Sequence, residues 1–266
     1  MKRSRTWRAG RYVKVIAYDS VRKNDCAQAR REKKNHSSKA QQELNARNSR
    51  AKLTAIIAEH FMDSPTALYL TLTFDNDHYP EFERESQYRS WCIKEMKNYV
   101  KRLQYWAKKR GALLKAVYWP DVGDENDRWH FHMLVDGISP EDAHAVWGKG
   151  NFDFHHLYAD TKWVTDREWF TKKKNVNPVA IAKYAMGNAS HRKLGQHCWF
   201  HTRSCTVPKP DASVVIRCEQ SIEPQDGCEI LNQERIETMY SSYVMYEYIL
   251  PRQNKPRRKS KRVKSL

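Results

Sequence analysis

The sequence lacks the features that mark several large classes of protein. It contains no run of 18 uncharged apolar residues, which excludes a conventional transmembrane helix. It has no Gly-x-x-x-x-Gly-Lys-Ser/Thr motif, which excludes a P-loop ATPase or helicase. The first 30 residues also lack the apolar stretch of a secretory signal. We therefore expect a cytoplasmic protein with no membrane partner and no nucleotide cofactor.

Cysteine occurs, but in no structural pattern. The six cysteines form no Cys-x-x-Cys pair and match no zinc-finger spacing. In a reducing cytosol we interpret them as free thiols. A zinc site made by His197, Cys198, His201 and Cys205 is a weaker alternative.

Acidic residues are too few to balance the basic ones. The chain has 48 Lys and Arg against 31 Asp and Glu, a formal net charge of +17, which favours nucleic acid as a partner. The excess lies at the two ends of the chain, where it is either bound to phosphates or merely solvated. We predict phosphate contacts. The predicted DNA-binding residues are Arg47, Arg50, Lys52, Arg257, Arg258 and Lys259.

Composition and periodicity divide the chain into parts. The predicted parts are a basic N-terminal region with a helix (1–65), a folded core (66–215), a C-terminal extension (216–250) and a basic tail too poor in apolar residues to fold alone (251–266). Residue periodicity predicts strands at about 67–74, 113–119, 129–135 and 151–157, and helices at about 40–61, 86–109, 139–147 and 178–189. This order predicts an α+β fold with the helices on one face of a sheet.

The sharpest chemical feature is His130-Phe131-His132 in the third predicted strand. Residues i and i+2 of a strand face the same side, so both imidazoles can reach one metal ion. Asp121 ends the preceding strand, and a hairpin would bring its carboxylate beside them. Two imidazoles and one carboxylate suit Mg²⁺ or Mn²⁺, and zinc is possible on the same ligands. The plainer interpretation is a pair of surface histidines; Asp124 and Glu125 are the alternative third ligands.

Several motifs occur in one order along residues 40–210. Leu70-Thr71-Leu72-Thr73-Phe74 is a strand, Trp147-Gly148-Lys149-Gly150 follows a short helix, and Ala180-Ile181-Ala182-Lys183-Tyr184 lies on a later helix. Together with the His-Phe-His strand and the basic helix over residues 42–61, this order resembles the HUH endonuclease superfamily. Within it, the motifs are similar to replication-associated proteins of the filamentous-phage gene II type.

The resemblance implies an antiparallel sheet of ferredoxin- or RRM-like type and a metal-dependent nickase for single-stranded DNA. Such an enzyme starts rolling-circle replication of a phage, plasmid or integrated element by joining a helix tyrosine to a 5′ phosphate. The matching residue here is Tyr184, with His130, His132 and Asp121 on the metal. The implied partners are a single-stranded origin and the host polymerase and helicase.

The tyrosine helix departs from the family pattern in two ways. The family continues Tyr-x-x-Lys, whereas this chain has Tyr184-Ala185-Met186-Gly187. Lys183 is a candidate to replace that lysine, although it lies about 100° round the helix from the tyrosine. Ala180 occupies the position of the second tyrosine in two-tyrosine initiators, so we expect one nucleophile at most. Tyr184 could instead be a packing residue of an amphipathic helix.

Two other functions are compatible with these motifs. A single-tyrosine transposase would use the same chemistry on the ends of a mobile element. A nucleic-acid-binding protein without nuclease activity would explain the loss of the lysine at Gly187.

Overall fold

The computed structural model describes residues 2–19, 39–123, 128–157, 170–171, 174–187, 196–237 and 242–252. The tail residues Arg257, Arg258 and Lys259 lie outside these ranges, as do the alternative ligands Asp124 and Glu125. None of the described helices is long and apolar enough to cross a membrane.

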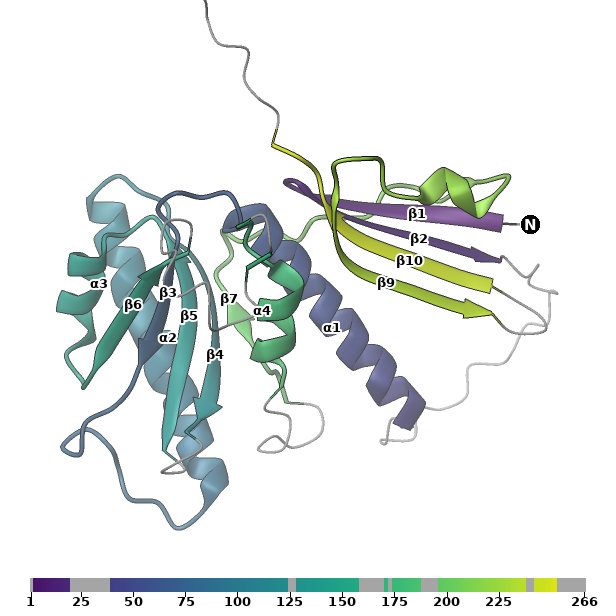
Figure 1. Ribbon diagram of the computed structural model, residues 1–266. Coiled ribbons are helices and arrows are strands. Elements are labelled where there is room, and N and C mark those ends of the chain that lie inside the picture. Colours follow the sequence, from purple (N-terminus) through teal and green to yellow (C-terminus); the bar gives the residue numbers. More distant parts are fainter. Residues whose placement is uncertain are drawn as a thin grey trace, which may run out of the picture.

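Two antiparallel five-stranded sheets organise the described residues (Figure 1). The first has the order β6-β3-β5-β4-β7. Its strands are β3 (Leu68–Leu72), β4 (Lys115–Val122), β5 (Trp129–Asp136), β6 (Phe152–His156) and β7 (Phe200–His201). The strands β3 to β6 confirm those predicted from alternation, and the β4–β5 pairing confirms the predicted hairpin. The α+β class is therefore confirmed.

Helices cover both faces of the first sheet, so the prediction that they pack on one face was wrong. The helices are α1 (Lys39–His60), α2 (Glu85–Lys109), α3 (Pro140–Trp147) and α4 (Pro178–Ala185). One core places α2 and α3 against Phe131 and Met133, while a separate core places α1 and α4 against Tyr69 and Trp119 on the other face. These strands carry apolar side chains on both faces of the sheet, so each face is stabilised by burial against helices.

Two helices start where their caps predict. The side chains of Ser139 and Asn177 accept hydrogen bonds from the backbone N–H groups three residues on, and a proline follows each cap at the first helical position. The helix α4 ends at Ala185 rather than near residue 189.

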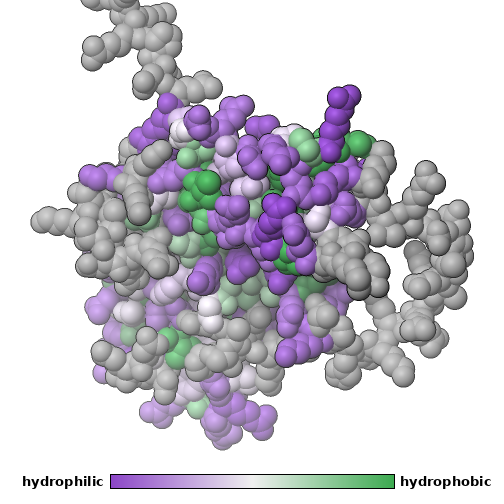
Figure 2. Space-filling model, turned by 45° about the vertical axis from the view of Figure 1, so that its right-hand side comes forward, coloured by the Kyte–Doolittle hydropathy of each residue, from purple (hydrophilic) through white to green (hydrophobic). Residues whose placement is uncertain are grey.

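A second sheet combines the two ends of the chain, and no sequence pattern predicted it. Its order is β8-β1-β2-β10-β9, with β1 (Lys2–Ala9) and β2 (Tyr12–Asp19) forming a hairpin. Gly10 has φ +55° in the two-residue turn, a conformation that glycine adopts without strain. The C-terminal strands are β8 (Val214–Val215), β9 (Glu229–Glu237) and β10 (Ser242–Ile249), preceded by the 3₁₀ helix η2 (Glu219–Ile222). Figure 2 shows this side of the molecule with mostly hydrophilic residues and small hydrophobic areas between them.

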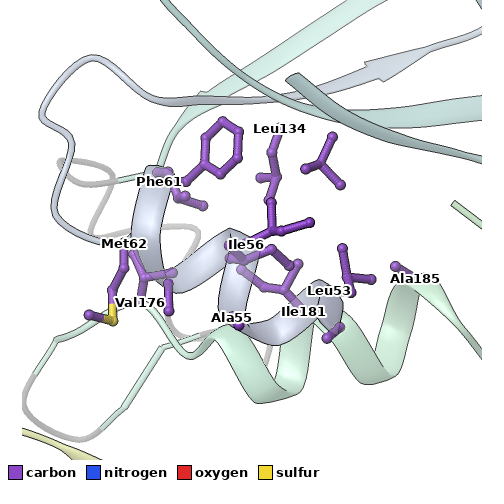
Figure 3. Packing of buried hydrophobic residues seen from close by; sticks show 14 of the residues in the cluster. Leu53, Ala55, Ile56, Phe61, Met62, Leu134, Val176, Ile181 and Ala185 are labelled. Carbon is purple, nitrogen blue, oxygen red and sulfur yellow. The ribbon is translucent and has the colours of Figure 1, made fainter. Parts of the chain in front are cut away.

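The helix α1 joins the two sheets through its C-terminal half. Leu53, Ile56 and Phe61 are fully buried and pack among Leu134 of β5 and Ile181 of α4 (Figure 3). The same core includes residues at the turn end of the second sheet. Burial of this half of α1 therefore holds α4 against the first sheet. It also holds the turn end of the second sheet in the same core.

We expect Leu53→Ala to lower the free energy of unfolding by about 2–5 kcal/mol, since it removes a fully buried side chain and leaves a cavity. Leu44→Ala, nine residues earlier on the same helix, removes a side chain that is 49% exposed and should change stability by less than about 0.5 kcal/mol. Urea denaturation of both variants measures the difference. Equal losses would contradict the proposed role of the C-terminal half of α1.

Candidate metal centre and active site

The pairing of β4 with β5 assembles three potential metal ligands. The register places Asp121 opposite His130, and alternation turns His132 to the same face. The two Nε2 atoms of the histidines are 3.3 Å apart, and His132 Nε2 is 3.3 Å from Asp121 Oδ2. Within the described ranges, this is the one group of three His, Cys, Asp or Glu side chains whose ligand atoms all lie within 4.8 Å of one another. The zinc alternative at residues 197–205 forms no such group among those residues.

The carboxylate of Asp121 is held in its charged form. Burial alone would raise its pKa, but the hydrogen bond to His132, the charges of both histidines and the Val122 N–H together lower the pKa below the usual value of 3.8. Only 4% of the residue is exposed. A buried anion beside two imidazoles is a donor set of two nitrogens and one oxygen that fits a divalent ion.

Both histidines are oriented by contacts at the other ring nitrogen. His130 Nδ1 is 3.3 Å from the carbonyl oxygen of Arg128, which can only accept a hydrogen bond. His132 Nδ1 is 3.2 Å from the hydroxyl of Thr71, and the ring of Tyr69 stacks on His132 with centroids 5.4 Å apart. These contacts turn Nε2 of each ring toward the cluster, where it would bind a divalent ion once it carries no proton.

The predicted nucleophile lies at this cluster. The Tyr184 hydroxyl is 3.2 Å from His132 Nε2 and donates a hydrogen bond of 3.3 Å to Asp121 Oδ2. Its ring makes edge contacts with the His132 and Trp119 rings, and 37% of the residue remains exposed. The helix α4 thus brings the phenol across the sheet to the carboxylate and leaves it open to solvent.

The lysine predicted to assist Tyr184 is not at the cluster. Lys183 is exposed, and no contact joins it to the three ligands in the part of the chain that is described. Gly187 follows the helix end, and its N–H donates to the Tyr184 carbonyl at 2.8 Å. A Cβ atom at Gly187 would lie 3.2 Å from that carbonyl oxygen. A lysine at position 187 would therefore lie outside the helix in this chain.

The DNA-binding residues predicted on α1 are spread over its exposed side. Arg47, Arg50 and Lys52 are all exposed, as phosphate contact requires. The Lys52 ammonium lies 5.6 Å from the ring of Trp199, whose Nε1 donates to Ser49. Their role in binding stays a prediction.

Sequence reasoning missed the residues that surround His132. Thr71 lies in a strand motif that assigns it no role, and no sequence pattern places Tyr69 or Trp119 at the site. The register of β3 with β5 places these residues at the site, because it pairs Thr71 with His132. Strand order was needed to obtain it, because β3 and β5 are separated by the helix α2 and by β4.

Comparison with known proteins identifies the segment that carries the site. Residues 67–189 match the family described as replication-associated proteins of the ORF2 and gene II protein type. The match runs from β3 through α4 and includes Asp121, His130, His132 and Tyr184. No curated protein and no solved structure gives a significant match to the chain. The match confirms the resemblance that the motifs indicated.

Replacing Thr71 by valine should weaken Mn²⁺ binding about 10-fold, because the hydroxyl that orients His132 is lost while the shape is kept. Thr71→Ser keeps a hydroxyl and should bind Mn²⁺ nearly as tightly as the unchanged protein. Isothermal titration calorimetry compares the three proteins. Equal affinity in Thr71→Val and the unchanged protein would show that this contact does not position the ligand.

Proposed function

Because residues 67–189 belong to this replication-associated family, we propose that the protein is a metal-dependent nickase of single-stranded DNA. It would start rolling-circle replication of a phage, plasmid or integrated element. The observation that carries the proposal is the Tyr184 hydroxyl, which lies 3.2 Å and 3.3 Å from two members of a potential metal site. Such an arrangement sets a nucleophile beside the centre that would hold the phosphate.

Asp121, His130 and His132 are the residues that would hold the ion, which we propose is Mg²⁺ or Mn²⁺. A bound divalent ion polarises a scissile phosphate and offsets the charge that develops on it. The buried, ionised Asp121 supplies the only negative charge of this ligand set. Thr71 and the Arg128 carbonyl hold the two imidazoles in the orientation that binding requires.

Tyr184 is the proposed nucleophile. Its phenolic oxygen attacks phosphorus, an O–P bond to the tyrosine forms, and the bond from phosphorus to the 3′ oxygen breaks. The phenolic proton leaves through the acceptors around the hydroxyl, and the departing 3′ oxygen takes up a proton from solvent. The products are a 5′-phosphotyrosine and a free 3′-OH. The ester keeps the phosphoryl group activated, so the same site can later rejoin strands.

The partners follow from these products. A single-stranded origin is the substrate, the host polymerase would extend the 3′-OH, and a host helicase would open the duplex ahead of it. Since Ala180 replaces a second tyrosine, the closing step requires another nucleophile, such as water or Tyr184 of a second copy of the chain.

A second candidate function is DNA binding without cleavage. It is favoured by the end of α4 at Ala185, which leaves no helical position for the family lysine. Lys183 is exposed on the same helix but does not contact the cluster. The two candidates differ in whether a covalent adduct forms.

Tyr184→Phe should eliminate the covalent protein–DNA adduct, because it removes the attacking oxygen, while Mn²⁺ and DNA binding persist. The assay incubates the protein with a labelled single-stranded origin and Mn²⁺ and detects the adduct by denaturing electrophoresis. Tyr105→Phe, which alters a tyrosine that is 66% exposed on α2, is the matched control and should form the adduct normally. An adduct mapped by mass spectrometry to another tyrosine would refute the assignment. The absence of any adduct with the unchanged protein would favour the binding protein.

His130→Ala and His132→Ala should each abolish nicking and leave the affinity for single-stranded DNA within about twofold, since the ligands bind the ion rather than the phosphates. Asp121→Ala should weaken Mn²⁺ binding about 10-fold or more, because the anionic ligand is lost. His144→Ala, which removes an exposed histidine of α3, is the control. Nicking at the unchanged rate by both histidine variants would show that the metal assignment is wrong.

A further inference from the structure

One face of the second sheet carries basic and aromatic side chains toward α1. Alternation and register place Arg3, Arg5 and Trp7 of β1 on the same face as Tyr18 of β2 and Tyr243 of β10. Arg3, Tyr18 and Tyr243 lie side by side across three strands. We call these five residues the basic aromatic face. The turn end of the same side of the sheet is buried in the core around α1.

The cations of this face are not neutralised within the described residues. Arg5 is exposed, and its guanidinium lies 5.6 Å from the ring of Trp7. Arg3 donates to the Ser213 hydroxyl at 3.3 Å, but its Nε has no hydrogen-bond partner there. No ion pair joins either arginine to a described carboxylate. In contrast, Lys14 on the same side of the sheet is paired with the buried Glu247 at 3.4 Å. On this face of the sheet, the arginines without a described ion-pair partner therefore both lie on β1.

A cation on the N-terminal half of α1 acts on this surface. Figure 1 shows α1 running between α4 and the second sheet and diverging from the sheet toward its own N-terminus. Burial is the main effect that raises the pKa of Tyr243; Glu234 and Glu247 add to it, and the charge of Arg47 opposes it. The exposed Arg47 thus lies near enough to Tyr243 to act on it electrostatically. Both elements therefore carry exposed cations near Tyr243.

The opposite face of the sheet has a different composition. Val13 and Val244 lie there in an apolar cluster with Ile222 of η2. Arg8 of β1 also lies on that face, 64% exposed and 3.9 Å from Asp211. The two faces of β1 therefore present exposed arginines in different surroundings.

We propose that the basic aromatic face, together with Arg47, is a second binding site for single-stranded DNA, separate from the nicking site. Unpaired arginines beside half-buried aromatic rings suit a single strand, whose phosphates can meet the cations and whose bases can stack on the rings. The face lies outside the segment that matches the replication-associated family. The site rests on the proposed function, because it would hold the strand that continues from the nick.

The connection to the nicking site is α1. Its C-terminal half packs against α4, which carries Tyr184, and against the turn end of the second sheet. Its N-terminal half carries Arg47, whose charge acts on Tyr243. A strand that runs from the phenol along the exposed side of α1 toward the N-terminus of the helix would meet Arg50 and then Arg47, which follow each other in that direction. This path gives the basic residues of α1 and those of β1 one common ligand.

The test measures fluorescence anisotropy of a labelled single-stranded oligonucleotide with the full chain. Trp7→Ala should weaken binding about 5-fold or more, which corresponds to the loss of one stacked base. Arg5→Ala should weaken binding and reduce the salt slope of log K by about 0.7, the value for one phosphate contact on a single strand. Arg8→Ala is the matched control on the other face of the same strand and should bind like the unchanged protein.

Two results of the anisotropy measurements would overturn the proposal. One is an equal loss for Arg8→Ala and Arg5→Ala, which would mean that charge alone matters and the face does not. The other is an equal effect of Arg5→Ala on the duplex of the same sequence, which would make the surface a duplex site. Thermal melting checks that Trp7→Ala is folded, and photocrosslinking of an iododeoxyuridine-labelled strand to Trp7 or Tyr243 supplies evidence that does not depend on that variant. Crosslinks confined to other elements would also overturn it.

The experiment separates this site from the nicking chemistry. If no adduct forms with the unchanged protein while Arg5→Ala still weakens binding, the proposed function fails and the binding site stands. If the adduct forms and Arg5→Ala and Trp7→Ala bind normally, the nickase stands and the second site fails.

Discussion

The register between β4 and β5 is the constraint on which the candidate site depends. Asp121 meets His130 only because these two residues are paired, and a slip by one residue would turn the histidines to the opposite face. That opposite face holds Phe131 and Met133, both fully buried against α2. Burial of large apolar side chains stabilises the protein by more than any single polar contact at the surface. The hydrophobic core on one face therefore fixes the geometry of the polar cluster on the other.

The position of Tyr184 depends on a second packing contact, between α4 and α1. Ile181 and Ala185 of α4 are buried in the core with Leu53; the first precedes the tyrosine by three residues and the second directly follows it. Residues four apart share a helix face, so burial of Ile181 and Ala185 sets the rotation of the short helix about its axis. With that rotation, the phenol points to the edge of the core, where His132 and solvent both reach it. The same packing of α4 therefore brings Tyr184 to the cluster and leaves its side chain partly exposed to solvent.

The local part of this arrangement could be predicted from the sequence, and the long-range part could not. Strand alternation and the hairpin were enough to bring Asp121 to the histidines, because their separation along the chain is short. The second sheet was missed because β2 pairs with β10, and no local pattern reveals a partner more than 220 residues away in the chain. The many charges of β1 also concealed its alternation. The sequence predicts helices on one face only, because no local pattern shows that Tyr69 and Trp119 pack in a second core under α1 and α4.

The distribution of charge determines how a polyanion would meet the site. The chain has a formal net charge of +17, yet the negative charge at its candidate centre is the buried carboxylate of Asp121. The two imidazoles of the cluster add no further negative charge. Exposed arginines act over a Debye length of about 8–10 Å at moderate salt and would attract a strand before it reaches the centre. The acidic residue that would hold a cation is compatible with an anionic ligand, because a bound divalent cation would more than balance its single negative charge.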